Sequence, residues 1–72
     1  MTNRTAILTY LRYKDFVPSG VIAREIHAHT GSKESTIERV MRSLTSEGKL
    51  EAKYAEAGVH YVSYRLLKVT LF

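Results

Sequence analysis

The chain has 72 residues, of which 44% are apolar and 25% are charged, and these proportions are typical of one small globular domain. Its formal charge of +4 and pI near 9.6 suit a polyanionic partner such as nucleic acid. Because the sequence has no cysteine and no apolar run long enough to span a membrane, disulfides, thiolate zinc sites and membrane insertion are excluded. We expect a cytoplasmic protein.

The first predicted helix covers residues 4–15, with Thr2 or Asn3 as its N-cap. Its apolar residues share one helical face: Ile7, Leu8 and Leu11. Residues 16–20 then interrupt the helical pattern, because Pro18 disfavours a helical conformation in the residue before it.

Two further helices are predicted in the middle of the chain. The second covers residues 20–29, with Ser19 as its N-cap and Gly31 after its end, where glycine takes the left-handed conformation at little cost. The third covers residues 33–47 and is capped by Ser32. Its apolar residues recur at helical spacing and form a continuous stripe: Ile37, Val40, Met41 and Leu44.

After Gly48 the apolar period changes from helical to alternating. Strands are predicted over residues 49–54 and 59–66, and the short loop between them, residues 55–58, makes the pair a β-hairpin. Residues 67–72 extend a strand or begin another.

The order of these elements resembles a winged helix-turn-helix domain of bacterial and phage regulators, and the resemblance covers Val17–Leu66, about two thirds of the chain. Ser35–Leu44 is similar to the recognition helix of that family, and Glu47–Leu50 to the entry into its wing. Ile22–Ile26 resembles the preceding helix, and Tyr64–Leu66 the second wing strand. The resemblance implies an α+β fold, with three helices followed by a β-hairpin wing, in one domain over residues 1–72.

The sequence departs from the family pattern at two places. The stretch Ala23–Gly31 is longer than the compact bacterial spacing, so the second helix or its turn is extended. The hairpin loop carries Glu56 instead of an arginine or lysine, which argues against minor-groove contact by the wing tip.

The resemblance implies sequence-specific binding of double-stranded DNA by a small transcriptional regulator, with the third helix in the major groove. The shortness of the chain suggests a phage or another mobile element. Arg39 and Arg42 point away from the apolar stripe, and an arginine fork matches the two acceptors of guanine. Phosphate contacts are expected near the helix start and on the wing. The predicted DNA-binding residues are Lys33, Ser35, Thr36, Arg39, Arg42, Ser43, Lys53 and Arg65, with Lys49 in support.

Other interpretations stay open. Glu38 and Arg42 can form a solvated i,i+4 pair, and Lys53 and Arg65 can pair with acidic neighbours across the strands. The domain can instead dock on a host transcription or replication protein, as a protein-interaction module. Tyr54, Tyr61 and Tyr64 can stack on single-stranded bases, but aromatic residues on a hairpin are more often packed, and Tyr64 is expected in the core. A homodimer can form through the apolar residues of the C-terminal segment, Val69, Leu71 and Phe72.

Catalysis, a metal and a cofactor are not expected. His27 and His29 point about 200° apart on a helix and cannot share one ion. The sequence has no paired carboxylates, no glycine-rich phosphate loop and no nucleophile–base pattern, so it does not indicate an enzyme.

Overall fold

The computed structural model describes residues 2–54 and 62–67. Those residues form, in order, α1 (Asn3–Tyr10), β1 (Val17–Pro18), α2 (Ser19–Thr30), α3 (Glu34–Ser46), β2 (Leu50–Tyr54) and β3 (Val62–Leu66). The described part of the chain is therefore a small α+β domain with three helices and a three-stranded antiparallel sheet, which confirms the predicted α+β class.

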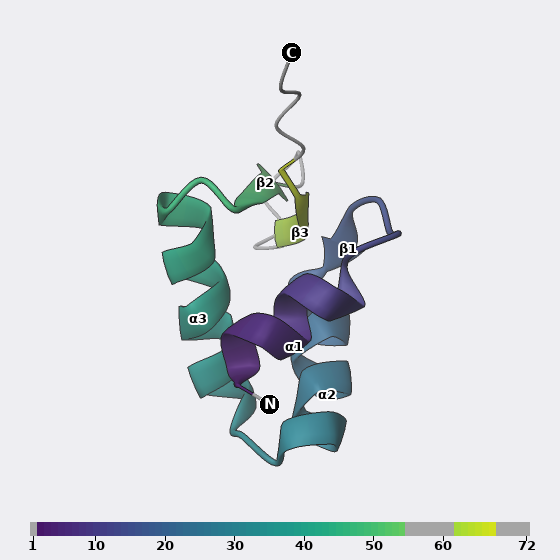
Figure 1. The fold of residues 1–72 in the computed structure, drawn as a ribbon, viewed down its shortest axis with the longest axis vertical. Helices are drawn as coiled ribbons and strands as arrows, with labels where there is room; N and C mark the ends of the chain where they lie inside the picture. The colour runs from purple at the N-terminus through teal and green to yellow at the C-terminus, as the bar shows by residue number, and fades with distance from the viewer. Residues whose placement is uncertain (1, 55–61, 68–72) are drawn as a thin grey trace.

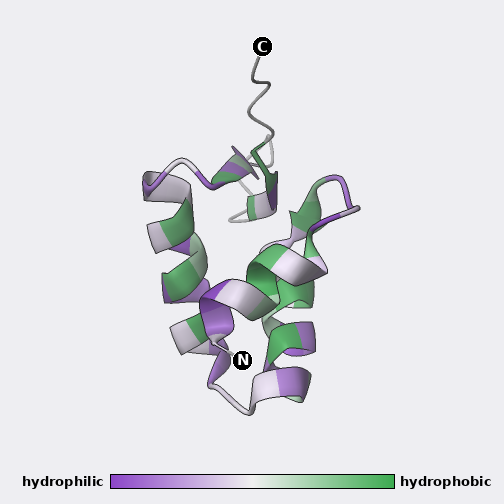
Figure 2. Cartoon of the chain, in the orientation of Figure 1, coloured by the Kyte–Doolittle hydropathy of each residue, from purple (hydrophilic) through white to green (hydrophobic). Residues whose placement is uncertain are grey.

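The three helices enclose one hydrophobic core. α2 and α3 lie on either side of α1, each helix contacts the other two, and the sheet lies at one end of the helices (Figure 1). Figure 2 shows polar and apolar residues on every helix, as expected for helices with one buried and one exposed face. The core residues are Ala6, Ile7, Leu11, Ile22, Ala23, Ile26, Ile37, Met41, Leu44, Leu50 and Tyr64. Each large aliphatic side chain buried there contributes about 1.5–3 kcal/mol.

The sheet has the strand order β1-β3-β2, so the last of the described strands in sequence lies in the middle. Tyr64 of β3 is opposite Val17 on one side and Ala52 on the other, and its side chain is buried. β1 was not predicted as a strand, because two residues are too few to show alternation. Pro18 has no N–H to donate, so it fits an edge strand and would not fit a central one.

The first helix ends five residues before the predicted position. After Leu11 the backbone bonds change from four-residue to three-residue spacing, as in Arg12 N to Thr9 O (3.3 Å) and Lys14 N to Leu11 O (3.1 Å). The side chains of residues 12–15 are exposed, so no apolar contact extends the helix there. The resulting turn brings Val17 opposite β3.

The predicted serine N-caps were wrong for both later helices. Ser19 is the first residue of α2, and its N-cap is Pro18, whose φ of −56° is set by the proline ring. The N-cap of α3 is Lys33, without a side-chain cap. Ser32 lies in the preceding turn, where its N–H donates to Thr30 Oγ1 (3.2 Å). Thr2 does cap α1, accepting from Thr5 N.

The two glycine stops are confirmed. Gly31 (φ 75°) and Gly48 (φ 80°) follow the ends of α2 and α3 in the left-handed region, which glycine enters without steric cost. The register between β2 and β3 confirms the antiparallel pairing of the predicted hairpin. Its loop, the first residues of the predicted second strand and residues 68–72 lie outside the described residues. Within the described ranges, none of the helices is long and apolar enough to cross a membrane.

An ion pair joins the start of α1 to the end of α3. Arg4 donates through Nη1 and Nη2 to the two carboxylate oxygens of Glu47, at 2.7 Å each. This hydrogen bonding lowers the pKa of the Glu47 carboxyl. The two parallel bonds hold the guanidinium in the plane of the carboxylate and link the two helix ends at the surface.

Candidate nucleic-acid interface

The exposed face of α3 carries most of the side chains predicted to contact DNA. Ile37, Met41 and Leu44 are fully buried, as the apolar stripe predicts, and Val40 is half-buried beside them. The residues on the opposite side of the helix are exposed: Ser35, Thr36, Arg39, Arg42 and Ser43. The buried stripe therefore determines which side chains α3 presents to a ligand.

Arg39 and Arg42 are three positions apart on this exposed face, about one helical turn. The ion pairs among the described residues involve Arg4 and Arg65, and neither α3 arginine takes part in one. The predicted Glu38–Arg42 pair is thus not formed in the described structure. The pKa of Tyr64 is raised mainly by burial; the charge of Glu38 also raises it, and the charge of Arg42 lowers it. Within the part of the chain that the structure describes, both guanidinium groups therefore keep their donors for a ligand.

The start of α3 lies next to the same face. Its first intrahelical bond runs from Ile37 N to Lys33 O (3.1 Å), so the N–H groups of residues 34–36 have no partner within the helix. The exposed hydroxyls of Ser35 and Thr36 and the ammonium of Lys33 lie at this end. Such a combination is suited to a phosphate group, and Glu34 in the same turn opposes it.

The turn before α3 is held by side-chain bonds. His27 Nδ1 lies 2.7 Å from the carbonyl oxygen of Ser32, and Thr30 Oγ1 donates to the carbonyl of Ile26 (2.9 Å). The first contact holds the connecting segment against the end of α2, and the second lies within α2. They also give His27 a structural role, and no group of metal-ligating side chains occurs among the described residues.

The structure does not bring the predicted wing residues together with the α3 arginines. Lys53 and Arg65 lie on the sheet face opposite the one that carries buried Tyr64, because side chains alternate along a strand. Arg65 donates through Nε to Glu51 (2.9 Å) and through Nη1 to Asp15 (3.0 Å). Its guanidinium also stacks over the Phe16 ring, 4.3 Å from the centroid. Arg65 is therefore engaged within the protein, as the cross-strand alternative predicted.

The pKa values follow this pairing. Hydrogen bonds from the Arg65 side chain and the Phe16 backbone lower the pKa of Asp15, and the bonds to Glu51 and Asp15 raise the pKa of Arg65. The Glu51 partner could have been found from the sequence, since it faces Arg65 in the hairpin register. Asp15 could not, because its position depends on the short strand β1, which the sequence pattern does not reveal.

The tyrosines considered for single-strand stacking lie in different environments. Tyr64 is buried in the core and cannot stack on a base, as the sequence predicted. Tyr54 is 74% exposed at the end of β2. Tyr61 lies outside the described residues, as do the residues of the predicted dimer contact, Val69, Leu71 and Phe72.

Comparison of the chain with protein-family models, with curated proteins and with solved structures found no match. The class of protein is therefore given by its residues and geometry. These define a small α+β domain whose third helix exposes two arginines that form no ion pair with any residue in 2–54 or 62–67.

Proposed function

We propose that the chain is a winged helix-turn-helix domain that binds double-stranded DNA in a sequence-specific manner, as a small transcriptional regulator. The observation that carries the proposal is the exposed face of α3, where Arg39 and Arg42 project from a helix whose other side is fixed in the core. A major groove about 12 Å wide admits one helix, and each arginine can donate a pair of bonds to a guanine edge.

The fold and the charge support this function. The described elements follow the order helix, strand, helix, helix, strand, strand, and three helices with a terminal antiparallel strand pair are compatible with a winged-helix domain. The net charge of +4 favours a polyanion. Lys33, Ser35 and Thr36 extend the α3 surface toward the adjoining phosphates, and Ser43 lies at its flank. Because Arg65 is tied to Asp15 and Glu51, we expect it to contribute less than the α3 residues.

The test is a fluorescence-anisotropy titration of a mixed-sequence duplex at several salt concentrations. The variant is Arg39→Ala/Arg42→Ala, and the matched control is Arg12→Ala/Lys14→Ala, which removes the same charge from the turn after α1. If both α3 arginines neutralise phosphates, the slope of log affinity against log salt falls by about 1.8, at about 0.9 for each contact. The control should keep the wild-type slope.

A second experiment tests base reading. Duplexes selected from a random pool by the wild-type protein should share a sequence, and each arginine lost from a base contact should cost about 1–3 kcal/mol of discrimination at its base pair. If the α3 variant and the control lose the same DNA affinity, the net charge of the protein, and not the position of the arginines, determines binding. DNA binding that does not depend on salt would refute the proposal. The proposal would also be refuted if no duplex binds at low salt and the random pool yields no shared sequence.

A further inference from the structure

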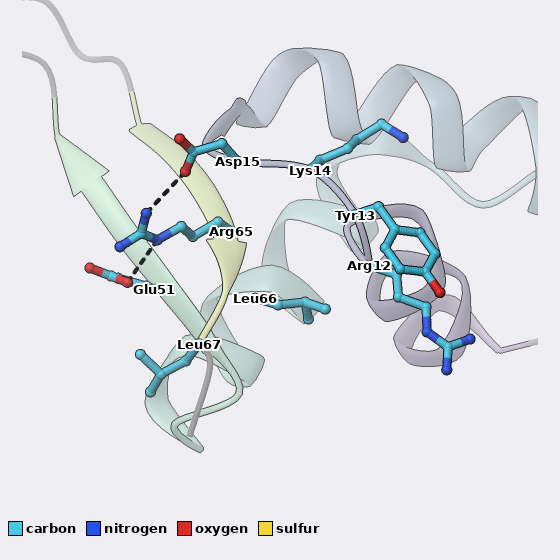
Figure 3. Close-up of a pocket in the computed structure, with 8 residues that line it drawn as sticks. All are labelled: Arg12, Tyr13, Lys14, Asp15, Glu51, Arg65, Leu66 and Leu67. Carbon is cyan, nitrogen blue, oxygen red and sulfur yellow. Dashed lines mark hydrogen bonds and ion pairs between the residues drawn. The ribbon is translucent and has the colours of Figure 1, made fainter. Parts of the chain in front are cut away.

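A pocket of about 560 Å³ lies between the turn that follows α1 and the end of β3 (Figure 3). It is lined by residues 12–15 of the turn, by Glu51 of β2 and by residues 65–67. No residue of α2 or α3 lines it, so it is separate from the surface proposed to bind DNA.

The pocket exposes apolar side chains to water. Tyr13 is 91% exposed and Leu67 is 41% exposed, and both line the same hollow together with Leu66. A single exposed apolar residue on a protein surface is ordinary. An exposed aromatic ring and two leucines around one concave site are what a binding site for an apolar group requires.

The charges at the pocket are not balanced. Its two carboxylates, those of Asp15 and Glu51, are already hydrogen-bonded to Arg65. Arg12 and Lys14 form no ion pair among the described residues and lie instead over tyrosine rings: Arg12 is 5.8 Å from the centroid of Tyr13, and Lys14 is 4.4 Å from that of Tyr10. Figure 3 shows both side chains extending from the turn, away from Arg65 and the two carboxylates bonded to it. The charge left for a partner is therefore positive.

We propose that this pocket docks a segment of a partner protein in which acidic residues adjoin a bulky apolar side chain. The apolar side chain lies against Tyr13, Leu66 and Leu67, and the carboxylates reach Arg12 and Lys14 at the rim. Charge complementarity distinguishes this occupant from others. A second copy also carries +4, and a nucleic acid supplies phosphates but no apolar side chain to lie against Leu66 and Leu67.

This proposal does not depend on DNA binding by α3. The pocket shares only Arg65 with the predicted DNA-binding residues, and that side chain is already bonded to Asp15 and Glu51. A chain that fails to bind DNA through α3 can therefore still bind the segment. A regulator with both surfaces could hold DNA on one side and a partner protein on the other.

The test is a titration of the full ¹⁵N-labelled chain with a capped synthetic peptide, Asp-Asp-Phe-Leu-Asp-Asp. Two-dimensional NMR spectra record the chemical shifts of the backbone amides at each peptide concentration. Two control peptides replace all Asp by Lys, or Phe and Leu by Ser. We expect saturable shifts at the amides of Tyr13, Arg65 and Leu67 and none at Arg39 or Arg42. Both control peptides should bind at least about tenfold more weakly, from the loss of one good contact each.

Variants then separate the two parts of the contact. Tyr13→Ala should weaken peptide binding about fivefold or more, and Arg12→Ala/Lys14→Ala by a similar factor, while Arg39→Ala/Arg42→Ala should leave it unchanged. These side chains are exposed, so the variants are expected to fold. No saturable shift, or equal binding of all three peptides, overturns the proposal. It is also overturned if these amides instead respond to protein dilution, indicating a second copy, or to an added DNA duplex.

Discussion

The contribution of α3 to the core can be tested by the substitution Leu44→Ala. The Leu44 side chain is fully buried among the three helices, and its removal leaves a cavity that the surrounding residues cannot completely fill. Such a change costs about 2–5 kcal/mol. A 72-residue domain has a total unfolding free energy of about 4–11 kcal/mol, so the loss is a large part of the whole.

Thermal and urea denaturation followed by circular dichroism measure this loss. A loss of 2 kcal/mol lowers Tm by at least about 8 °C in a domain of this size. The matched control is Leu67→Ala, which removes the same atoms from a side chain that is 41% exposed, and it should cost less than about 1 kcal/mol. If Leu44→Ala costs no more than the control, burial against α1 and α2 does not determine the position of α3, and the reasoning is wrong.

Two further predictions concern the backbone and the ion pairs. Gly31→Ala should lower the free energy of unfolding by about 1 kcal/mol, measured in urea, because φ is 75° there, although a Cβ would meet no atom within 4 Å. If Gly31→Ala unfolds with the same free energy as the wild type, the left-handed conformation at this position does not require glycine. The pKa of Asp15 is lowered in the folded chain, so its contribution to stability is present above its unfolded pKa, about 4, and is lost as the pH falls through the folded value. Asp15→Asn should therefore reduce the fall of Tm between pH 5 and pH 2, and an unchanged pH profile would contradict the pairing with Arg65.

Most of the helical fold was predictable because periodicity and glycine carry local information. The apolar stripe of α3 placed Ile37, Met41 and Leu44 correctly, and Gly31 and Gly48 marked the helix ends. The end of α1 was not predictable, because it depends on where β1 must pair. β1 itself has two residues, and its pairing with β3 depends on contacts about fifty residues away in sequence.

Some residues of the candidate site were predictable from the sequence, and others were not. The exposure of Arg39 and Arg42 follows from the helical position of the stripe and needed no tertiary information. The pairing of Arg65 with Asp15 did need tertiary information, since Asp15 reaches this side chain only after the turn following α1 has formed. The hollow beside Tyr13 could not be predicted either, because its walls come from three separate parts of the chain.

The strand order β1-β3-β2 has a consequence for synthesis on the ribosome. Since β3 lies between the other two described strands, neither β1 nor β2 has its partner until Val62–Leu66 has been made. The three helices are complete in sequence well before that point, and domains form from the N-terminus during translation. A nascent chain that stops before Val62 would therefore expose the apolar faces of Val17, Leu50 and Ala52 at the end of the helices, and the last described strand closes the fold.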